Sequence, residues 1–376
     1  MSAEARLVRV QRVREAMESR GVDALLLSLG ADLPWLTGYE AMPLERLTML
    51  VLPLEGEATL VVPRLEAPRV SEAPDLFALR PWEETEDPVA VVASLIGGGG
   101  RRAGRGGDLC LAVSDRAWAT FLLQLQALLP SARWLAASTI TAPLRAVKDH
   151  AEVAALAAAS AAADRVAADL VAGRIPLAGC TESEVSAHIG RRLLEEGHQR
   201  VNFDIVGSGP NAASPHHEAG PRRIQKGEAV VCDFGGTMAG YCSDITRTVF
   251  TGRPTAEFEG LYWVLQEAQS AAVAAAVVGT PCEEVDAAAR RIIEKAGYGP
   301  QFFHRTGHGI GREEHEDPYI VAGNQAALVP GHAFSVEPGI YVSGRFGARI
   351  EDIVVATDDG PRPLNQVDHA LAIVES

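Results

Sequence analysis

The stretch EAVVCDFGG, residues 228–236, sets a single acid inside an apolar strand pattern. Asp233 follows the run AVVC and precedes Phe234, at a position where an apolar residue is the ordinary choice. A carboxylate buried in a strand is costly unless it is hydrogen-bonded, paired with a cation or bound to a metal. Asp233 is therefore the first candidate for a functional site.

A second acid follows at a spacing that suits a hairpin. Asp244, in the stretch SDITRT, comes eleven residues after Asp233, and three glycines lie between the two acids. Two adjacent antiparallel strands joined by a short glycine-containing turn would bring both carboxylates to the same region. Each aspartate alone would be read as an ordinary turn residue at a strand end.

A similar arrangement recurs near the end of the chain. Glu337, in FSVEPGIY, and Glu351, in GARIEDIVV, stand fourteen residues apart on either side of a segment that contains several glycines. Each glutamate interrupts an apolar strand pattern. The two pairs of acids predict two hairpins, and their similarity is a faint sign of internal duplication.

Three of the ten histidines lie in HRTGHGIGREEHEDP, residues 304–318. The stretch alone leaves metal binding, acid/base chemistry and ordinary packing open for His304, His308 and His315. Four carboxylates and one imidazole in one place would repel each other unless cations neutralised them. Such oxygen-rich ligation suits Mn²⁺, Co²⁺, Fe²⁺ or Zn²⁺, and two ions about 3.5–4 Å apart share ligands in metal-assisted hydrolysis.

The composition excludes several classes of protein. The chain has 376 residues, a formal net charge of −15 and 47% hydrophobic residues, as expected for a globular protein with a substantial core. The negative charge argues against nucleic acid or an anionic membrane surface as a partner. Five cysteines without a C-x-x-C pattern, no long apolar segment and a charged first helix predict a cytoplasmic protein.

The pattern of elements changes along the chain. The first part mixes short β-rich runs with helices, of which the first is expected to end at Gly21. Helices with capping boxes then follow, at TESE (181–184) and TPCE (280–283). We expect an α/β (α+β) fold with domains 1–140 and 141–376. The glycine-rich stretch 97–107 lacks the end of a phosphate-binding loop and is interpreted as a surface loop.

The ordered contexts DFGG, SDITRT, GHGIG, VEPGIY and RIED closely resemble those of metallopeptidases with the pita-bread fold. Within that group the chain resembles the Xaa-Pro peptidases, aminopeptidase P and prolidase. The resemblance is specific over about 141–376, and residues 33–63 resemble, less specifically, the creatinase-like N-terminal domain. It implies two divalent metal ions, with Mn²⁺ favoured, a peptide substrate with proline in second position, and a homodimer.

The resemblance also implies a role for individual residues. One metal would be held by Asp233 and the other by His308 and Glu337, while Asp244 and Glu351 would bridge both. Glu337 would also be the general base toward water. The remaining assignments are catalytic roles for His216 (substrate binding), His315 (stabilisation of the tetrahedral intermediate) and His304 (a donor lining the pocket), with Arg349 and Tyr341 supporting the ligands. His217 is given no role.

The resemblance leaves two substrate classes open, Xaa-Pro dipeptides and longer peptides. Prolidase cleaves Xaa-Pro dipeptides and needs a cation for the free proline carboxylate, and many prolidases carry arginine just after the His-Glu-x-Pro motif. Here Tyr319 stands at that position, which favours aminopeptidase P, although a basic residue from elsewhere would restore dipeptidase activity. Methionine aminopeptidase and a non-catalytic binding protein of the same fold are less favoured alternatives. Trp35 is interpreted as a core residue rather than a contact to a partner subunit.

Overall fold

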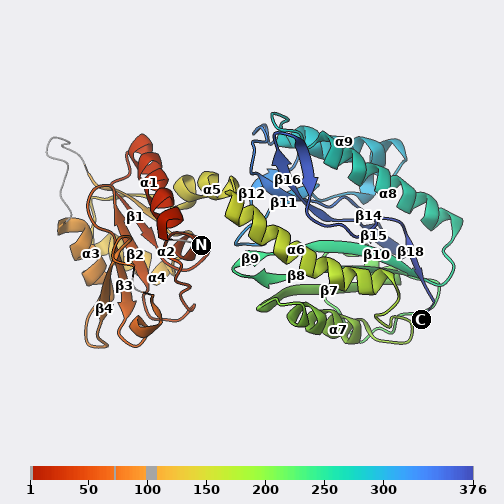
Figure 1. Cartoon of the computed structure of the whole chain (residues 1–376), viewed down its shortest axis with the longest axis horizontal. Helices are drawn as coiled ribbons and strands as arrows, with labels where there is room; N and C mark the ends of the chain where they lie inside the picture. Colours follow the sequence, from red (N-terminus) through yellow and green to blue (C-terminus); the bar gives the residue numbers. More distant parts are fainter. Residues whose placement is uncertain (1–2, 72, 99–107, 376) are drawn as a thin grey trace. The chain divides into compact units, whose positions relative to one another are not determined.

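A computed structural model describes residues 3–71, 73–98 and 108–375 of the chain (Figure 1). The chain divides into two compact units, Met1–Leu144 and Arg145–Ser376. Most of the predicted glycine-rich surface loop, residues 99–107, lies outside the described residues. Among the described helices, none combines the length and the apolar character that crossing a membrane requires.

The first unit is built on a six-stranded mixed sheet in the order β4-β3-β2-β1-β5-β6. Its strands are β1 (Ala24–Leu27), β2 (Met49–Pro53), β3 (Thr59–Pro63), β4 (Ala78–Trp82), β5 (Cys110–Val113) and β6 (Arg133–Ala136). The helical segments that begin in this unit are α1 (Ala3–Arg20), α2 (Asp32–Thr37), η1 (Ala67–Arg69), α3 (Pro88–Gly98), α4 (Ala119–Leu128) and α5 (Ser138–Ala146).

Both faces of this sheet are buried, which explains its uninterrupted apolar strands. Leu25 and Leu27 of β1 pack in one core with α1 and α2, whereas Leu26 packs in a second core with α3 and α4. The first helix ends before Gly21, which has a φ of 67°, as predicted. Trp35 is 2% exposed and belongs to the core, as expected.

The second unit contains two five-stranded sheets and a two-stranded ribbon. The first sheet runs β18-β10-β8-β7, with β9 paired to β8; the second runs β12-β11-β13-β16-β17; the ribbon is β14-β15. The strands are β7 (Arg200–Ser208), β8 (Ala229–Met238), β9 (Tyr241–Cys242), β10 (Ile245–Thr251), β11 (Gly307–Gly309), β12 (Glu316–Ile320), β13 (Ala333–Val336), β14 (Gly339–Val342), β15 (Phe346–Arg349), β16 (Asp352–Thr357), β17 (Gly360–Pro363) and β18 (Ala372–Val374).

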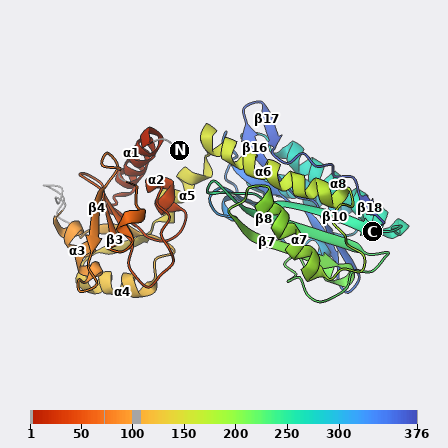
Figure 2. The same ribbon diagram turned by 60° about the horizontal axis from the view of Figure 1, so that its bottom comes forward.

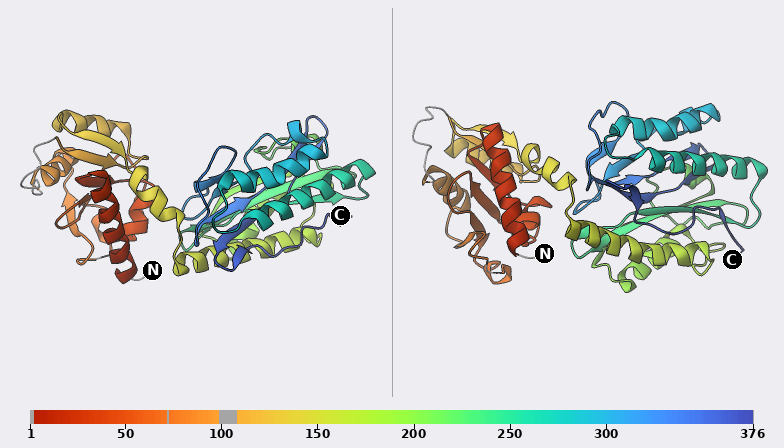
Figure 3. Two further views of the ribbon diagram at one scale, coloured as in Figure 1. Left: turned by 90° about the horizontal axis from the view of Figure 1, so that it is seen from above. Right: turned by 45° about the horizontal axis from the view of Figure 1, so that its top comes forward.

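Helices cover the two sheets of this unit from outside (Figures 2 and 3). Helices α6 and α7 pack on the first sheet, and α8 and α9 pack on the second. The helical segments are α6 (His150–Val171), α7 (Glu182–Glu195), η2 (Gly209–Ala213), α8 (Ala256–Ala275), α9 (Cys282–Lys295) and η3 (Gly299–Gln301). The mixture of helices and sheets confirms the expected α/β (α+β) class.

Only one of the two predicted capping boxes forms. Thr181 caps α7, and its hydroxyl oxygen accepts a hydrogen bond from the backbone N–H of Glu184, as predicted. The prediction for Thr280 is wrong, because the N-cap of α9 is Pro281. The carbonyl of Thr280 instead accepts a hydrogen bond from Leu328, so pairing with a distant segment determines where this helix begins.

The core beneath α8 allows a direct test of this packing. Phe258 is 1% exposed and its ring contacts those of Phe250, Tyr262 and Phe346. We expect Phe258→Ala to lower the free energy of unfolding by about 3–5 kcal/mol, because it leaves a cavity. Trp263, 59% exposed on the same helix, supplies the control: Trp263→Ala should change it by less than about 0.5 kcal/mol. Urea denaturation measures both, and equal losses would contradict the assigned core.

Candidate metal centre

A cavity of about 790 Å³ in the second unit collects the residues that the sequence singled out. All five predicted metal ligands and the three predicted catalytic histidines line it. The lining residues are Asn202, Phe203, Ile205, Ser214, Pro215, His216, Asp233, Asp244, Phe303, His304, Arg305, His308, Glu314, His315, Glu337, Arg349 and Glu351. Tyr341 is not among them and lies behind Arg349.

The first pair of acids comes from adjacent antiparallel strands, as predicted. β8 and β10 pair with Asp233 opposite Thr246, and Asp244 directly precedes β10. Gly235 makes this approach possible, because a Cβ at this position would overlap the carbonyl oxygen of Ser243. The absence of a side chain at residue 235 therefore lets the chain bring Asp244 back beside β8.

The second pair of acids lies at two breaks in one long hairpin. The predicted strands 332–342 and 348–357 are each interrupted, at Glu337 and at Glu351. Val336 pairs with Asp352 on one side of the breaks and Gly339 pairs with Arg349 on the other. Because the register is the same on both sides, Glu337 and Glu351 stand opposite each other. The acids are thus freed from regular pairing and directed into the cavity.

His308 enters the cavity from the short strand β11. Its Nδ1 lies 3.2 Å from the carbonyl oxygen of Gly309, which would accept the Nδ1 proton of the neutral ring. Its Nε2 then presents a lone pair, 3.2 Å from Oε1 of Glu337 and 3.8 Å from Oδ2 of Asp244. An imidazole oriented by a backbone carbonyl is the usual arrangement of a metal ligand.

The electrostatics of the acids fit bound cations. Burial is the main cause that raises the pKa of Asp244 and of Glu351 well above their usual range, and the neighbouring carboxylates raise it further. Ligand atoms of Asp244, His308 and Glu351 all lie within 4.8 Å of one another. Oδ1 of Asp233 is buried and lacks a hydrogen-bond partner among the described residues. A divalent cation would supply both the missing charge and the missing partner, so the donor set fits a metal centre.

Arg349 compensates one carboxylate and connects it to further residues. Its Nη2 donates to Asp233 Oδ2 at 2.5 Å, and its Nη1 donates to the hydroxyl oxygen of Tyr341 at 2.9 Å. That hydroxyl lies 3.0 Å from Nε2 of His304, whose Nδ1 lies 2.7 Å from the carbonyl oxygen of Arg305. Both ring nitrogens of His304 therefore have protein partners, although the residue lines the cavity as expected; its role as a donor stays a prediction.

His315 and His216 lie at the open part of the cavity. The ring of His315 stands 4.1 Å from that of His308, centroid to centroid. Partial burial is the main cause that lowers the pKa of His315 to about 4, and the nearby His308 and Arg305 lower it further. The ring is therefore neutral near pH 7. His217 is turned away: its Nε2 lies 2.8 Å from Oε2 of the fully buried Glu182. This contact anchors the loop that carries His216, a role the sequence did not reveal.

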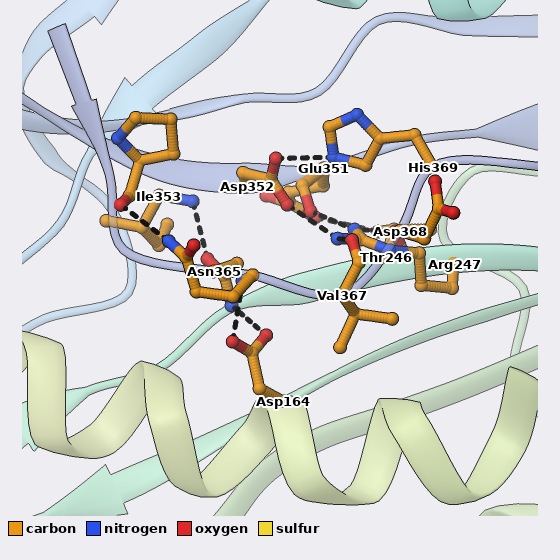
Figure 4. A network of polar contacts seen from close by, with 12 residues as sticks. Asp164, Thr246, Arg247, Glu351, Asp352, Ile353, Asn365, Val367, Asp368 and His369 are labelled. Atoms are coloured by element: carbon orange, nitrogen blue, oxygen red, sulfur yellow. Dashed lines mark hydrogen bonds and ion pairs between the residues drawn. The ribbon is translucent and has the colours of Figure 1, made fainter.

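A buried network behind Glu351 fixes the main chain at this predicted ligand (Figure 4). Arg247 donates to the carbonyl oxygens of Glu351 and Val367, each at 2.7 Å, and to Asp352 Oδ1 at 2.8 Å. His369 lies 2.6 Å from the other carboxylate oxygen of Asp352. The hydroxyl of Thr246, next to Arg247, donates to Glu351 Oε2 at 2.7 Å. The C-terminal segment is thereby joined to the metal centre.

Sequence reasoning did not identify Arg305 and the apolar wall of the cavity. Phe203, Ile205 and Phe303 line the cavity, yet each lies in an ordinary apolar pattern. Arg305 stands beside His304, but arginine in a polar loop carries no signal of its own. Its aromatic partner is Tyr319, and that pairing appears only in the folded chain.

Arg247 is the residue whose loss should disturb the network most. We expect Arg247→Met to lower the free energy of unfolding by about 3–5 kcal/mol, because Asp352 loses its buried cation. Metal affinity should fall roughly 10- to 100-fold, as when other supports of metal ligands are removed. Urea denaturation and calorimetric metal titration measure these effects. Arg345→Met, which removes an exposed cation paired with Glu257, is the control and should leave both quantities near wild type.

Comparison with known proteins gives the family. Residues 151–358 match the model of Metallopeptidase family M24, and residues 9–147 match the Creatinase/Prolidase N-terminal domain. The chain is 43% identical over 376 residues to the probable dipeptidase PepE of Mycobacterium tuberculosis, covering 99% of this chain and 97% of the relative. The crystal structure of dipeptidase PepE from Mycobacterium ulcerans has a TM-score of 0.92 and 44% identity, with 100% of both chains covered.

A further solved structure supports the same assignment. The prolidase from Thermococcus sibiricus has a TM-score of 0.92 and 36% identity, again with 100% of both chains covered. The resemblance to pita-bread metallopeptidases is thus confirmed over both parts of the chain, and so is the expectation of a metallo-exopeptidase. The chain belongs to Metallopeptidase family M24.

Proposed function

We propose that this protein is an Xaa-Pro dipeptidase that uses two divalent metal ions, with Mn²⁺ as the favoured metal. The observation that carries the proposal is the convergence of four carboxylates and one imidazole, from two hairpins and β11, on one buried cavity. The dipeptidase and prolidase relatives span nearly the whole chain, which supports a dipeptide substrate. Aminopeptidase P, favoured by Tyr319 in the sequence, is the second candidate.

In the proposed metal centre, Asp233 would hold one ion, His308 and Glu337 would hold the other, and Asp244 and Glu351 would contribute to both. When bound, a pair of divalent ions lowers the pKa of water and polarises the scissile carbonyl group. The side chains that remain around the metals are then available to bind the peptide and to move protons.

Glu337 is proposed as the general base. Without metal, burial would raise the pKa of Glu337, but the hydrogen bond and charge of a protonated His308, together with His304 and Arg349, lower it, which favours the ionised carboxylate. An ionised carboxylate accepts the proton of the attacking water and delivers it to the proline nitrogen as the peptide bond breaks. His315 donates to the oxyanion and His216 binds the substrate, while the excess of carboxylates attracts the N-terminal amine.

The cellular location and the oligomeric state are also proposals. All five cysteines are free in the structure, which fits a reducing compartment such as the cytoplasm. The homodimer implied by the resemblance stays a prediction, to be checked by sedimentation of the purified protein.

The metal content provides a test that is independent of the substrate. Purified protein should contain two divalent ions per chain, and chelation should abolish hydrolysis of Ala-Pro until Mn²⁺ is restored. Asp244→Ala should lose metal, because it removes a bridging ligand, whereas Asp359→Ala at an exposed turn should bind metal like the wild type. Elemental analysis measures the content, and full occupancy in Asp244→Ala would rule out the proposed bridge.

The base assignment has its own test. Glu337→Gln should lower kcat on Ala-Pro by at least about 100-fold with the fold kept, because an amide cannot accept the proton. Steady-state kinetics and circular dichroism give the two readouts. Since Glu337 is also a proposed ligand, metal content is measured on the same sample. Near-normal turnover by a variant that retains its metal would refute the assignment.

A further inference from the structure

The loop between β11 and β12 presents its side chains to two different surroundings. Residues 311–315 form bends rather than a strand, and Glu314 and His315 among them line the cavity. Glu313, and Glu316 at the start of β12, do not line it and form ion pairs with cations of the segment that leads into α6. The same short loop thus carries a proposed catalytic histidine beside acids that are tied to another part of the chain.

Glu316 receives two cations, one on each carboxylate oxygen. Nζ of Lys148 lies 2.6 Å from Oε1, and Arg145 donates to Oε2. Arg145 also donates to Oε2 of Glu313 at 3.0 Å, so the cluster joins two acids to two cations. The side chain of Lys148 is 1% exposed and that of Glu316 is 9% exposed. Breaking a pair as buried as this one is costly, so the pair holds the carboxylate of Glu316 in place.

Lys148 comes from a fixed position in the main chain. Its backbone N–H donates to the carbonyl oxygen of Gly331 at 2.9 Å, and Val147 forms an isolated bridge with His332. Asp149, the next residue, caps α6 through a complete capping box. The lysine is therefore anchored on both sides, and its buried ammonium group has a defined position.

The loop approaches Lys148 closely, and a glycine allows this approach. A Cβ at Gly311 would lie 2.0 Å from Oε1 of Glu316 and 3.1 Å from Cε of Lys148. A side chain at residue 311 would therefore displace the carboxylate from the ammonium group. The carbonyl oxygen of Gly311 also accepts a hydrogen bond from the backbone N–H of Cys242 at 2.8 Å, so the loop is held at this end as well.

His315 depends on this loop for its place. Its ring stands beside that of His308, but its ring nitrogens have no hydrogen-bond partner among the described residues. By contrast, both ring nitrogens of His304 contact protein groups. A ring whose nitrogens stay available to a substrate is oriented mainly by its own main chain, and the main chain of His315 is anchored at the next residue, Glu316.

We propose that Lys148 is a positioning residue for His315: by pairing with Glu316, it fixes the main chain from which His315 reaches the reacting carbonyl group. Lys148 does not line the cavity, so it acts on the reaction only through residues that do. The inference rests on the proposed function, in which His315 donates to the oxyanion, and adds the residue that holds this donor in place. A displacement of about 1 Å in such a donor costs roughly 100-fold in rate.

Lys148→Met removes the charge and keeps a side chain of similar length. We expect kcat on Ala-Pro to fall roughly 10- to 100-fold while KM stays within about threefold of the wild type, because stabilisation of the transition state is lost and binding is not. Elemental analysis should find the metal content of the wild type, and circular dichroism should show its fold. Lys226→Met, at an exposed turn, is the control and should keep the wild-type kcat.

A double-mutant cycle shows whether the effect passes through His315. His315→Ala should lower kcat roughly 100- to 1000-fold, and adding Lys148→Met should lower it by less than about twofold more, because the donor is already absent. A residue that only stabilises the fold gives a different result. Phe258→Ala, in a core that does not line the cavity, should change kcat by the same factor in both backgrounds.

Glu316→Gln tests the same link from the other partner and keeps the size of the side chain. It replaces the carboxylate by a neutral amide and so weakens the pair with Lys148. We expect kcat to fall by a smaller factor than in Lys148→Met, and this loss should also vanish in the His315→Ala background. This variant supplies the result if Lys148→Met does not fold.

The outcomes separate the inference from the proposed function. A near-normal kcat in Lys148→Met, a loss of metal from this variant, or a decrease that persists in full beside His315→Ala overturns the role of Lys148 while the dipeptidase function stands. Wild-type turnover by His315→Ala overturns the role of both residues in the oxyanion step. A wild type loaded with metal that does not cleave Ala-Pro overturns the proposed function, and the inference with it.

Discussion

The pairing register on either side of Glu337 and Glu351 is the constraint on which the candidate metal centre depends. Val336 opposite Asp352 and Gly339 opposite Arg349 leave the two glutamates facing each other across a break in the hairpin. A slip by one residue would turn every side chain to the opposite face. Thr246 bonds Glu351 through backbone and hydroxyl, so the same register also fixes the distance to the acids of β8 and β10.

Concentrating acids in this way leaves an excess of negative charge that the chain balances only in part. Arg349 neutralises Asp233, and Arg247 neutralises Asp352, which follows the predicted ligand Glu351. Asp244 has only His308 within ion-pair distance, at 3.8 Å, and Glu351 has no ion pair among the described residues, so burial raises the pKa of both carboxyls. These raised pKa values mean that a cation bound by the carboxyls would compete with protons for them.

Part of the support for the candidate centre comes from residues that do not line the cavity. Glu182 accepts hydrogen bonds from Ser208 and Asn211 and contacts His217, which holds the loop of His216. Asp286 of α9 accepts hydrogen bonds from the backbone N–H and the hydroxyl of Thr306, and thereby holds the segment that carries His304. Buried acids with complete sets of donors act here as rigid mounts for the functional side chains.

The sequence by itself determined the α/β (α+β) class, most strand positions and the set of acids and histidines, because acids in apolar strands and short spacings across turns are local signals. Tertiary structure alone decided where the strands break, since Glu337 and Glu351 interrupt patterns that look continuous. It also replaced the predicted cap at Thr280 by a pairing with Leu328 and gave both nitrogens of His304 protein partners. The stacking of Arg305 on Tyr319 joins residues with no local relation, and only the paired strands β11 and β12 bring them together.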